Sequence, residues 1–307
     1  MEHYLYIIAF ATIAGTLSRF IMLKTDYRQY PTNPHGSLIH LSLGFIAAAL
    51  GAVAIPALIE QDFAAVTFLA LAAQQFREIR NMERETLQKL EVTELVPRGE
   101  DFIEGVARAF EARNYLVILI SIFTSLAAFL ITELTNIYWG LLGGAVIAVV
   151  LIYIALKLME GQRIIDIADV DKAEIRFDDA NLFVEDIQIM NIGLKEGQET
   201  ILKKGLAVMI KPKDADAVAI LGDVGQRQAL THVASKLLGI YKDVDTPEFT
   251  PLARRNEDNG YVALYIVPTH GTSEDLIDAI ERTPLLESAI SRPSLSAVGR
   301  HIKQEEE

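Results

Sequence analysis

Two long apolar runs decide the fold class, and only a short polar link separates them. Residues 115–156 read YLVILISIFTSLAAFLITELTNIYWGLLGGAVIAVVLIYIAL. An α-helix needs roughly 20 apolar residues to cross the hydrocarbon core of a bilayer, and each run approaches that length. We therefore expect the two runs, 115–132 and 137–156, to form a hairpin of membrane-spanning helices.

Two further runs, 4–22 and 38–59, lie upstream and are also long enough to span a membrane. The stretch 63–73, FAAVTFLALAA, is short, but it continues into a helical pattern that predicts one helix over 63–91. Its first part would then cross the membrane as a fifth span.

The distribution of basic residues orients these spans, because Lys and Arg stay on the cytoplasmic side. The segment 74–114 is rich in Arg, whereas the link 133–136 contains no basic residue. A five-span arrangement places no basic residue outside, but four spans would expose Lys24 and Arg28. We therefore predict about five spans, a multi-pass protein of the cell membrane and a cytoplasmic C-terminal domain.

Composition excludes several classes of protein. The 307-residue chain is 51% hydrophobic, has a formal net charge of −13 and contains no cysteine. Disulfides, cysteine-ligated metals and thiol catalysis are thereby excluded, and the acidity argues against nucleic acid as a partner. The six histidines show no metal-ligand spacing, so we expect neither a metal site nor a cofactor.

The charge also divides the chain into two parts. Residues 1–159 hold 11 Lys and Arg against 14 Asp and Glu, a net of −3, and the remainder holds 17 against 27, a net of −10. Strand-like and helix-like segments are mixed beyond the last apolar run, which is typical of an α+β domain. We expect a helical membrane domain over 1–159, a small soluble α+β domain over 160–290 and a flexible acidic tail over 291–307.

Within that soluble part, two alternating segments, 173–177 and 182–190, flank a turn and predict a β-hairpin. Helices are expected over 196–204, 214–238 and 273–290, and strands over 206–210 and 261–267. A break of the second helix at Gly222 or Gly225 is the alternative to one continuous helix. The stretch 241–260 has the composition of a polar linker.

The segment 74–114 ends in an amphipathic pattern. Phe102, Val106 and Phe110 recur at spacings of four residues after a capping Asp101. The pattern predicts a helix that lies on the inner leaflet before the chain enters the next span.

This segment also resembles a known family. Residues 102–107 read FIEGVA, which is similar to the motif that gives the YIEGIA family of endospore-forming Firmicutes its name. Similar stretches occur along most of the chain: TDYRQYP at 25–31, PHG at 34–36, FLALAAQQFR at 68–77, RNMERETL at 80–87, EARNYL at 111–116, NIGL at 191–194 and GQRQA at 225–229. The resemblance implies an integral membrane protein associated with sporulation. A membrane-linked proteolytic role with a small capping subunit is a further implication.

Ionisable residues near the predicted membrane surface are the candidate site residues, because burying charge there is costly. A carboxylate pair for acid–base peptide hydrolysis would combine Asp26 with Asp101 or Glu104. A polar cluster at the membrane surface would bring together Arg19, Arg28, His35, His40 and Arg113. Gln226, Arg227 and Gln228 are expected on an exposed docking surface; a plain solvated helix face is the alternative.

Two functions follow from these expectations. The first is a sporulation-associated membrane protein that assembles a complex through its cytoplasmic domain, with the lipid bilayer and a cytoplasmic protein as partners. The second is a membrane-bound peptidase that acts in sporulation and is controlled by a small capping subunit. Transport is a weaker alternative, because the sequence shows no internal repeat.

Overall fold

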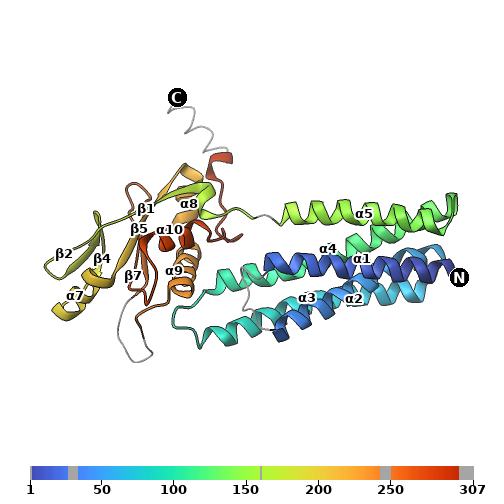
Figure 1. Cartoon of the computed structure of the whole chain (residues 1–307), viewed down its shortest axis with the longest axis horizontal. Helices are drawn as coiled ribbons and strands as arrows, with labels where there is room; N and C mark the ends of the chain where they lie inside the picture. The colour runs from blue at the N-terminus through green and yellow to red at the C-terminus, as the bar shows by residue number, and fades with distance from the viewer. Residues whose placement is uncertain (1, 27–33, 160, 243–249, 297–307) are drawn as a thin grey trace. The chain divides into compact units, whose positions relative to one another are not determined.

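The computed structural model describes residues 2–26, 34–159, 161–242 and 250–296. The chain folds into two compact units (Figure 1). The first contains residues 1–86 and 106–160, and the second contains residues 87–105 and 161–307. The sequence assigns the segment 87–105 to the membrane half, whereas the structure places it in the second unit.

Five long helices make up the first half of the chain: α1 (Glu2–Asp26), α2 (Pro34–Ile59), α3 (Phe63–Glu91), α4 (Glu100–Leu134) and α5 (Ile137–Leu158). Four of them, all except α3, are long and apolar enough to cross a membrane. Helix α3 has the limits that the sequence predicts, but it is apolar only in its first part.

Small residues allow the helices of the first unit to approach closely. A Cβ atom at Gly44 would collide with the side chain of Arg19, and one at Gly51 would meet the backbone of Ile118. Ser125 of α4 donates a hydrogen bond to the carbonyl of Ala52 at 3.0 Å. Such contacts are typical of helices that pack in lipid, where polar side chains also hydrogen-bond across helices.

Helix α4 differs from the sequence-based expectation of a surface helix followed by a separate span. Residues 100–134 form one continuous helix of 35 residues. The apolar residues of the amphipathic part, Phe102, Val106 and Phe110, are all buried. Their spacing of four residues places them on one face of α4, and this face packs against protein.

The second unit contains two antiparallel sheets. Strands β1 (Ala168–Lys172), β5 (Leu206–Pro212), β7 (Val262–Ile266) and β6 (Leu252–Arg255) form the larger sheet in that order. Strands β2 (Ile175–Asp178), β3 (Asn181–Val184) and β4 (Ile187–Asn191) form the smaller one. The helical elements are α6 (Ile164–Ile167), α7 (Lys195–Lys204), α8 (Ala215–Gly222), α9 (Val224–Leu238), α10 (Ser273–Glu281) and a short 3₁₀ helix, Pro293–Leu295.

The larger sheet has a core on both faces, and every residue of β7 is buried. Met209 and Tyr265 point to the same core as Leu182 and Ile189 of the smaller sheet. Because side chains alternate along a strand, the opposite face presents residues such as Leu264, and α8, α9 and α10 contact the larger sheet. The α+β class expected of this part is therefore observed.

The elements of the second unit follow the sequence in most places. The β2–β3 hairpin, helix α7 with its end at Gly205, and the end of α9 at Gly239 confirm the predictions. The helix predicted over 214–238 is divided at Asp223 into α8 and α9, which is the alternative with a break near Gly222. The predicted strand 182–190 is instead two strands, because Glu185 adopts a positive φ of 51° and turns the chain. Helix α10 ends at Glu281 rather than near residue 290, just before Pro284. The proposed linker contains strand β6, and the tail from residue 297 lies outside the described residues.

Candidate functional site

The connection between α3 and α4 packs against α9 within the second unit. The Nδ1 atom of His232 lies 2.7 Å from the carbonyl oxygen of Val96. A carbonyl can only accept, so His232 must carry its proton on Nδ1 and donate it to Val96. This bond fixes the tautomer of a largely buried histidine and ties α9 to the connection.

An ion pair supports the same contact. Lys236 lies one turn after His232 in α9. Its Nζ atom is 2.6 Å from Oε2 of Glu94. Glu94 also pairs with Arg98 at 3.8 Å. Burial alone would raise the pKa of Glu94, but the hydrogen bond and the charge of Lys236, with that of Arg98, outweigh burial and lower the pKa.

The residues that follow approach α9 very closely. Gly99 has a positive φ of 93°, and a Cβ atom there would collide with the side chain of Gln228. Gly225 would likewise collide with the carboxylate of Asp101. Phe102 meets the ring of His232 edge-on, with ring centroids 6.2 Å apart. The residues that precede and begin the FIEGVA stretch therefore contact α9, the helix that contains GQRQA.

His232 is the titratable residue at the centre of this contact. Burial lowers its pKa below the ordinary 6.5, and the positive charges of Arg98 and Lys236 act in the same direction. The hydrogen bond to Val96 and the charge of Glu94 oppose them. The net effect keeps the ring neutral near pH 7.

The three predicted catalytic carboxylates belong to different parts of the structure. Asp26 is the last residue of α1 in the first unit, and its side chain lies outside the described residues. Asp101 is exposed and Glu104 half-buried, one turn apart at the start of α4 in the second unit. Asp101 lies beside Gly225 at the N-terminal end of α9, where the helix dipole favours a negative charge. This position gives Asp101 a structural role, and its pairing with Asp26 stays a prediction.

The motif at residues 102–107 has two different sides. Phe102, Ile103, Val106 and Ala107 are at most 4% exposed, so they hold the fold together. Glu104 and Gly105 lie between them and are partly exposed. Apart from its chain neighbours and the backbone of its own helix, no described atom lies within 4 Å of the position that a Cβ atom would take at Gly105. Unlike Gly99 and Gly225, this glycine has no role in packing among the described residues.

Part of the predicted polar cluster does come together, within the first unit. Arg19 is fully buried, and its Nη2 atom lies 3.5 Å from Nδ1 of His40. Phe110 contacts both, with its ring centroid 5.5 Å from the Arg19 guanidinium and 4.5 Å from the His40 ring. Arg113 is also buried and lies within electrostatic range of His40. Arg28 and the side chain of His35 lie outside the described residues.

The predicted docking surface at residues 226–228 needs correction. Gln226 is fully buried: its Nε2 donates to the carbonyl of Pro284 at 3.1 Å, and its Oε1 accepts from the amide of Leu286 at 2.8 Å. Arg227 is half-buried against the end of α8, and Gln228 is half-buried against Gly99. A polar helical triplet cannot occupy one face, because successive residues point in directions about 100° apart.

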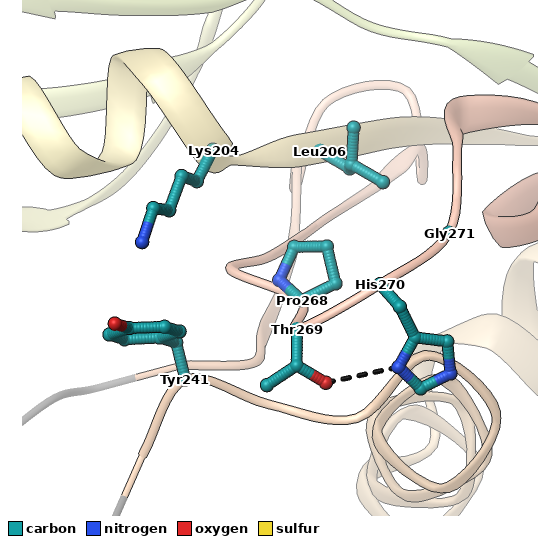
Figure 2. A pocket seen from close by; sticks show the side chains of 7 residues that line it. All are labelled: Lys204, Leu206, Tyr241, Pro268, Thr269, His270 and Gly271. Carbon is teal, nitrogen blue, oxygen red and sulfur yellow. Dashed lines mark hydrogen bonds between the residues drawn. The ribbon is translucent and has the colours of Figure 1, made fainter.

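Two shallow cavities occur in the second unit. One, of about 280 Å³, is shown in Figure 2: Lys204 points across the ring of Tyr241 at 4.0 Å, and Thr269 bonds His270 at 3.0 Å. The other, of about 250 Å³, lies between the connection and α9, where Val96, Gln228 and Lys242 contribute to its wall. Among the residues that the structure describes, neither lining contains a carboxylate. Within the described ranges, no group of three His, Asp or Glu residues is arranged to hold a metal ion.

Sequence reasoning considered His232 only as a metal ligand and did not single out Glu94. Their roles depend on a contact between segments more than 100 residues apart, which periodicity does not reveal. The signal that was available is the presence of two family-like stretches, FIEGVA and GQRQA, because the residues just before the first stretch contact the second.

Comparisons with known proteins agree with the resemblance. The sequence model of the YIEGIA family, described as YIEGIA protein, matches residues 7–296. A protein of Bacillus subtilis (strain 168), described as uncharacterized protein YphB, is 44% identical over 294 residues, which is 96% of this chain and 96% of the relative. No solved structure matches the chain.

Proposed function

Because the chain belongs to the YIEGIA family, we propose that it is a sporulation-associated membrane protein that assembles a complex through its second unit. The docking face of this unit is formed by Asp101, Glu104 and Gly105 at the start of α4. A protein partner binds there and approaches the helix backbone closely at Gly105. The relative from a spore-forming bacterium supports the sporulation context.

The observation that carries this proposal is the open space at Gly105. Glycine in the interior of a helix costs roughly 0.5–1 kcal/mol relative to alanine. Elsewhere in the chain this cost is offset, because a neighbouring side chain lies too close to leave room for a Cβ atom. Gly225, which Asp101 approaches, is an example. At Gly105 no neighbour among the described residues requires a close approach, so we infer that the surface of another protein packs against the helix there.

The arrangement in the membrane is part of the same proposal. Four apolar helices span the bilayer, and the first part of α3 adds a fifth span. The Arg-rich segment 74–114 then stays in the cytoplasm together with the second unit, in accordance with the positive-inside rule.

Proteolysis is the second candidate, and it is favoured by the two carboxylates, Asp101 and Glu104, one turn apart on this face. Assembly is preferred because Asp101 already has a structural role beside Gly225.

The decisive experiment replaces Gly105 with leucine in spore-forming cells. A leucine projects into open space, so the protein should fold and reach the membrane in normal amounts. The partner should no longer co-purify after cross-linking, and the variant should not complement a deletion. Gly193→Leu is the matched control, because Gly193 also has open space around it and lies elsewhere in the second unit.

If Gly105→Leu complements the deletion and retains the same cross-linked proteins as the wild type, the assembly proposal is wrong. A parallel variant, Asp101→Asn/Glu104→Gln, separates the two candidates. Under the proteolytic alternative, specific proteins that disappear with the wild type should persist with this variant although the complex still forms.

A further inference from the structure

Three arginines gather where α8, α9 and β6 meet in the second unit. Arg227 is in the first turns of α9, and Arg254 and Arg255 are the last residues of β6. Burial lowers the pKa of Arg227, and the charges of Arg255 and Arg254 lower it further; only Asp223 opposes them. Like charges are thus held together in a part of the chain whose net charge is −10.

The end of helix α8 accounts for one of these cations. Arg227 donates from Nε to the carbonyl of Asp223 and from Nη2 to the carbonyl of Gly222, each at 3.4 Å. A cation at the C-terminal end of a helix is favourable, because the carbonyl groups there carry partial negative charge. Arg254 is likewise engaged, since its Nε donates to the carbonyl of Ile189 at 3.2 Å.

For Arg255, in contrast, no hydrogen bond from the guanidinium group to a carbonyl is observed among the described residues. The guanidinium of Arg255 packs over the last turn of α8. If Gly222 had a Cβ atom, this atom would lie 2.7 Å from Nη1 of Arg255. Its Nε atom is buried and has no hydrogen-bond acceptor among the described residues. A buried donor of a charged group is costly to leave without an acceptor, and such groups in native proteins call for an explanation.

From this geometry we propose that Arg227 and Arg255 bind a phosphate group at the turn between α8 and α9. Guanidinium groups form paired hydrogen bonds with phosphate oxygens and are the preferred phosphate ligands where geometry matters. A phosphate monoester carries about −1.5 to −2 charges at pH 7, so it balances two guanidinium groups better than a carboxylate does. One oxygen of the Asp223 carboxylate accepts from the amide of Gln226 at 2.8 Å, and the charge of this carboxylate offsets only part of the positive charge of the three arginines.

The test uses the full-length protein in detergent micelles free of phospholipid, with inorganic phosphate as the probe in calorimetric titrations. The wild type should bind phosphate saturably, whereas acetate at equal ionic strength should not bind. Arg227→Gln/Arg255→Gln should weaken the affinity at least about 10-fold, as expected when two charge-assisted contacts are removed. Arg282→Gln is the matched control, because Arg282 is an exposed arginine of α10 that pairs with Asp278.

The proposal is overturned if the wild type does not bind phosphate, or if the double variant binds it as tightly as the control. Circular dichroism checks the fold. Should the double variant unfold, Arg227→Lys/Arg255→Lys keeps both charges but not the paired geometry and should still bind more weakly than the wild type. Equal binding by this variant would also contradict the proposal.

A second arm identifies the source of the phosphate group. The titration is repeated in lipid nanodiscs of phosphatidylcholine with and without phosphatidic acid, whose headgroup is a phosphate monoester. If the anionic lipid weakens the affinity for inorganic phosphate, a lipid headgroup occupies the site. If the affinity is unchanged, the ligand is a soluble phosphate compound.

Discussion

His232 donates a hydrogen bond to the carbonyl of Val96 across 136 residues of sequence, and this bond joins α9 to the connection between α3 and α4. The second unit is therefore discontinuous in sequence. Its two pieces also meet through Glu94 and Lys236 and through Phe102 and the His232 ring. The connection is thus a structural part of the second unit.

Acid should weaken this junction in a defined pH range. The pKa of His232 is lowered in the folded protein, so below about pH 6.5 the unfolded chain binds a proton that the folded chain does not. Its contribution to stability is complete above pH 6.5 and is lost as the pH falls. Hydrogen exchange of the amides in α9 should therefore accelerate between about pH 7 and pH 5 beyond the intrinsic pH effect.

His232→Gln keeps a donor for Val96 but cannot titrate, so this acceleration should disappear in the variant. His270→Gln, which changes an exposed histidine of the same unit, is the control and should behave as the wild type does. An unchanged response in His232→Gln would assign the effect to another group.

The ion pair between Glu94 and Lys236 should contribute measurably but modestly. Half of the Lys236 side chain is exposed, and such pairs typically contribute about 0.2–1 kcal/mol. A double-mutant cycle of Glu94→Gln and Lys236→Gln, measured by denaturant unfolding, should give a coupling energy in this range. The pair Lys211 and Asp171, at the edge of the larger sheet, provides a comparison in which both partners are more exposed. A coupling energy of zero for Glu94 and Lys236 would show that the junction depends on its apolar contacts and the His232 bond.

Two glycines, six residues apart, should respond to alanine in opposite ways. Gly99→Ala should destabilise the second unit by more than about 1 kcal/mol, because its φ is positive and the new methyl group collides with Gln228. Gly105→Ala should instead raise stability by about 0.5–1 kcal/mol, since the site is open and alanine favours the helix. Thermal unfolding in one detergent measures both, and a loss of stability in Gly105→Ala would place a neighbour at that position.

Replacing the buried amide of Gln226 should be costly. Gln226→Leu leaves the amide of Leu286 and the carbonyl of Pro284 without their partner, which costs about 1–3 kcal/mol for each buried group. Gln228→Leu, only two residues away and half-buried, should cost less. Denaturant unfolding compares the two, and similar losses would contradict the assigned role of Gln226.

Local patterns in the sequence predict the elements that depend on them. Apolar runs and turn residues place α3, the β2–β3 hairpin and the end of α9 correctly. Strand β6 was missed because its sequence, LARR, has no apolar alternation and is a strand through its pairing with β7. The burial of Gln226 was missed for a related reason. Nothing in the polar triplet 226–228 indicates that the side-chain amide of Gln226 hydrogen-bonds the backbone of Pro284 and Leu286.

The candidate site was predicted only in part. The cost of burying charge singles out Arg19, His40 and Arg113 in the sequence, and the first unit brings these three residues together. Asp101 and Glu104 were identified as chemically interesting, but the contact of Asp101 with Gly225 is non-local. The junction at His232 could not be derived, because the pairing of distant segments depends on the three-dimensional arrangement of the whole unit.

The two-piece second unit also constrains how the protein is made. The first piece of the second unit, residues 87–105, leaves the ribosome long before α9 does. The rest of α4, all of α5 and the first strands are synthesised in between. Until α9 emerges, Phe102 and Ile103 cannot pack against the second piece, and the second unit cannot reach its complete fold. The second unit can therefore be completed only late in biosynthesis. A complete second unit forms only in chains in which α4 and α5, which lie between its two pieces, have already been synthesised.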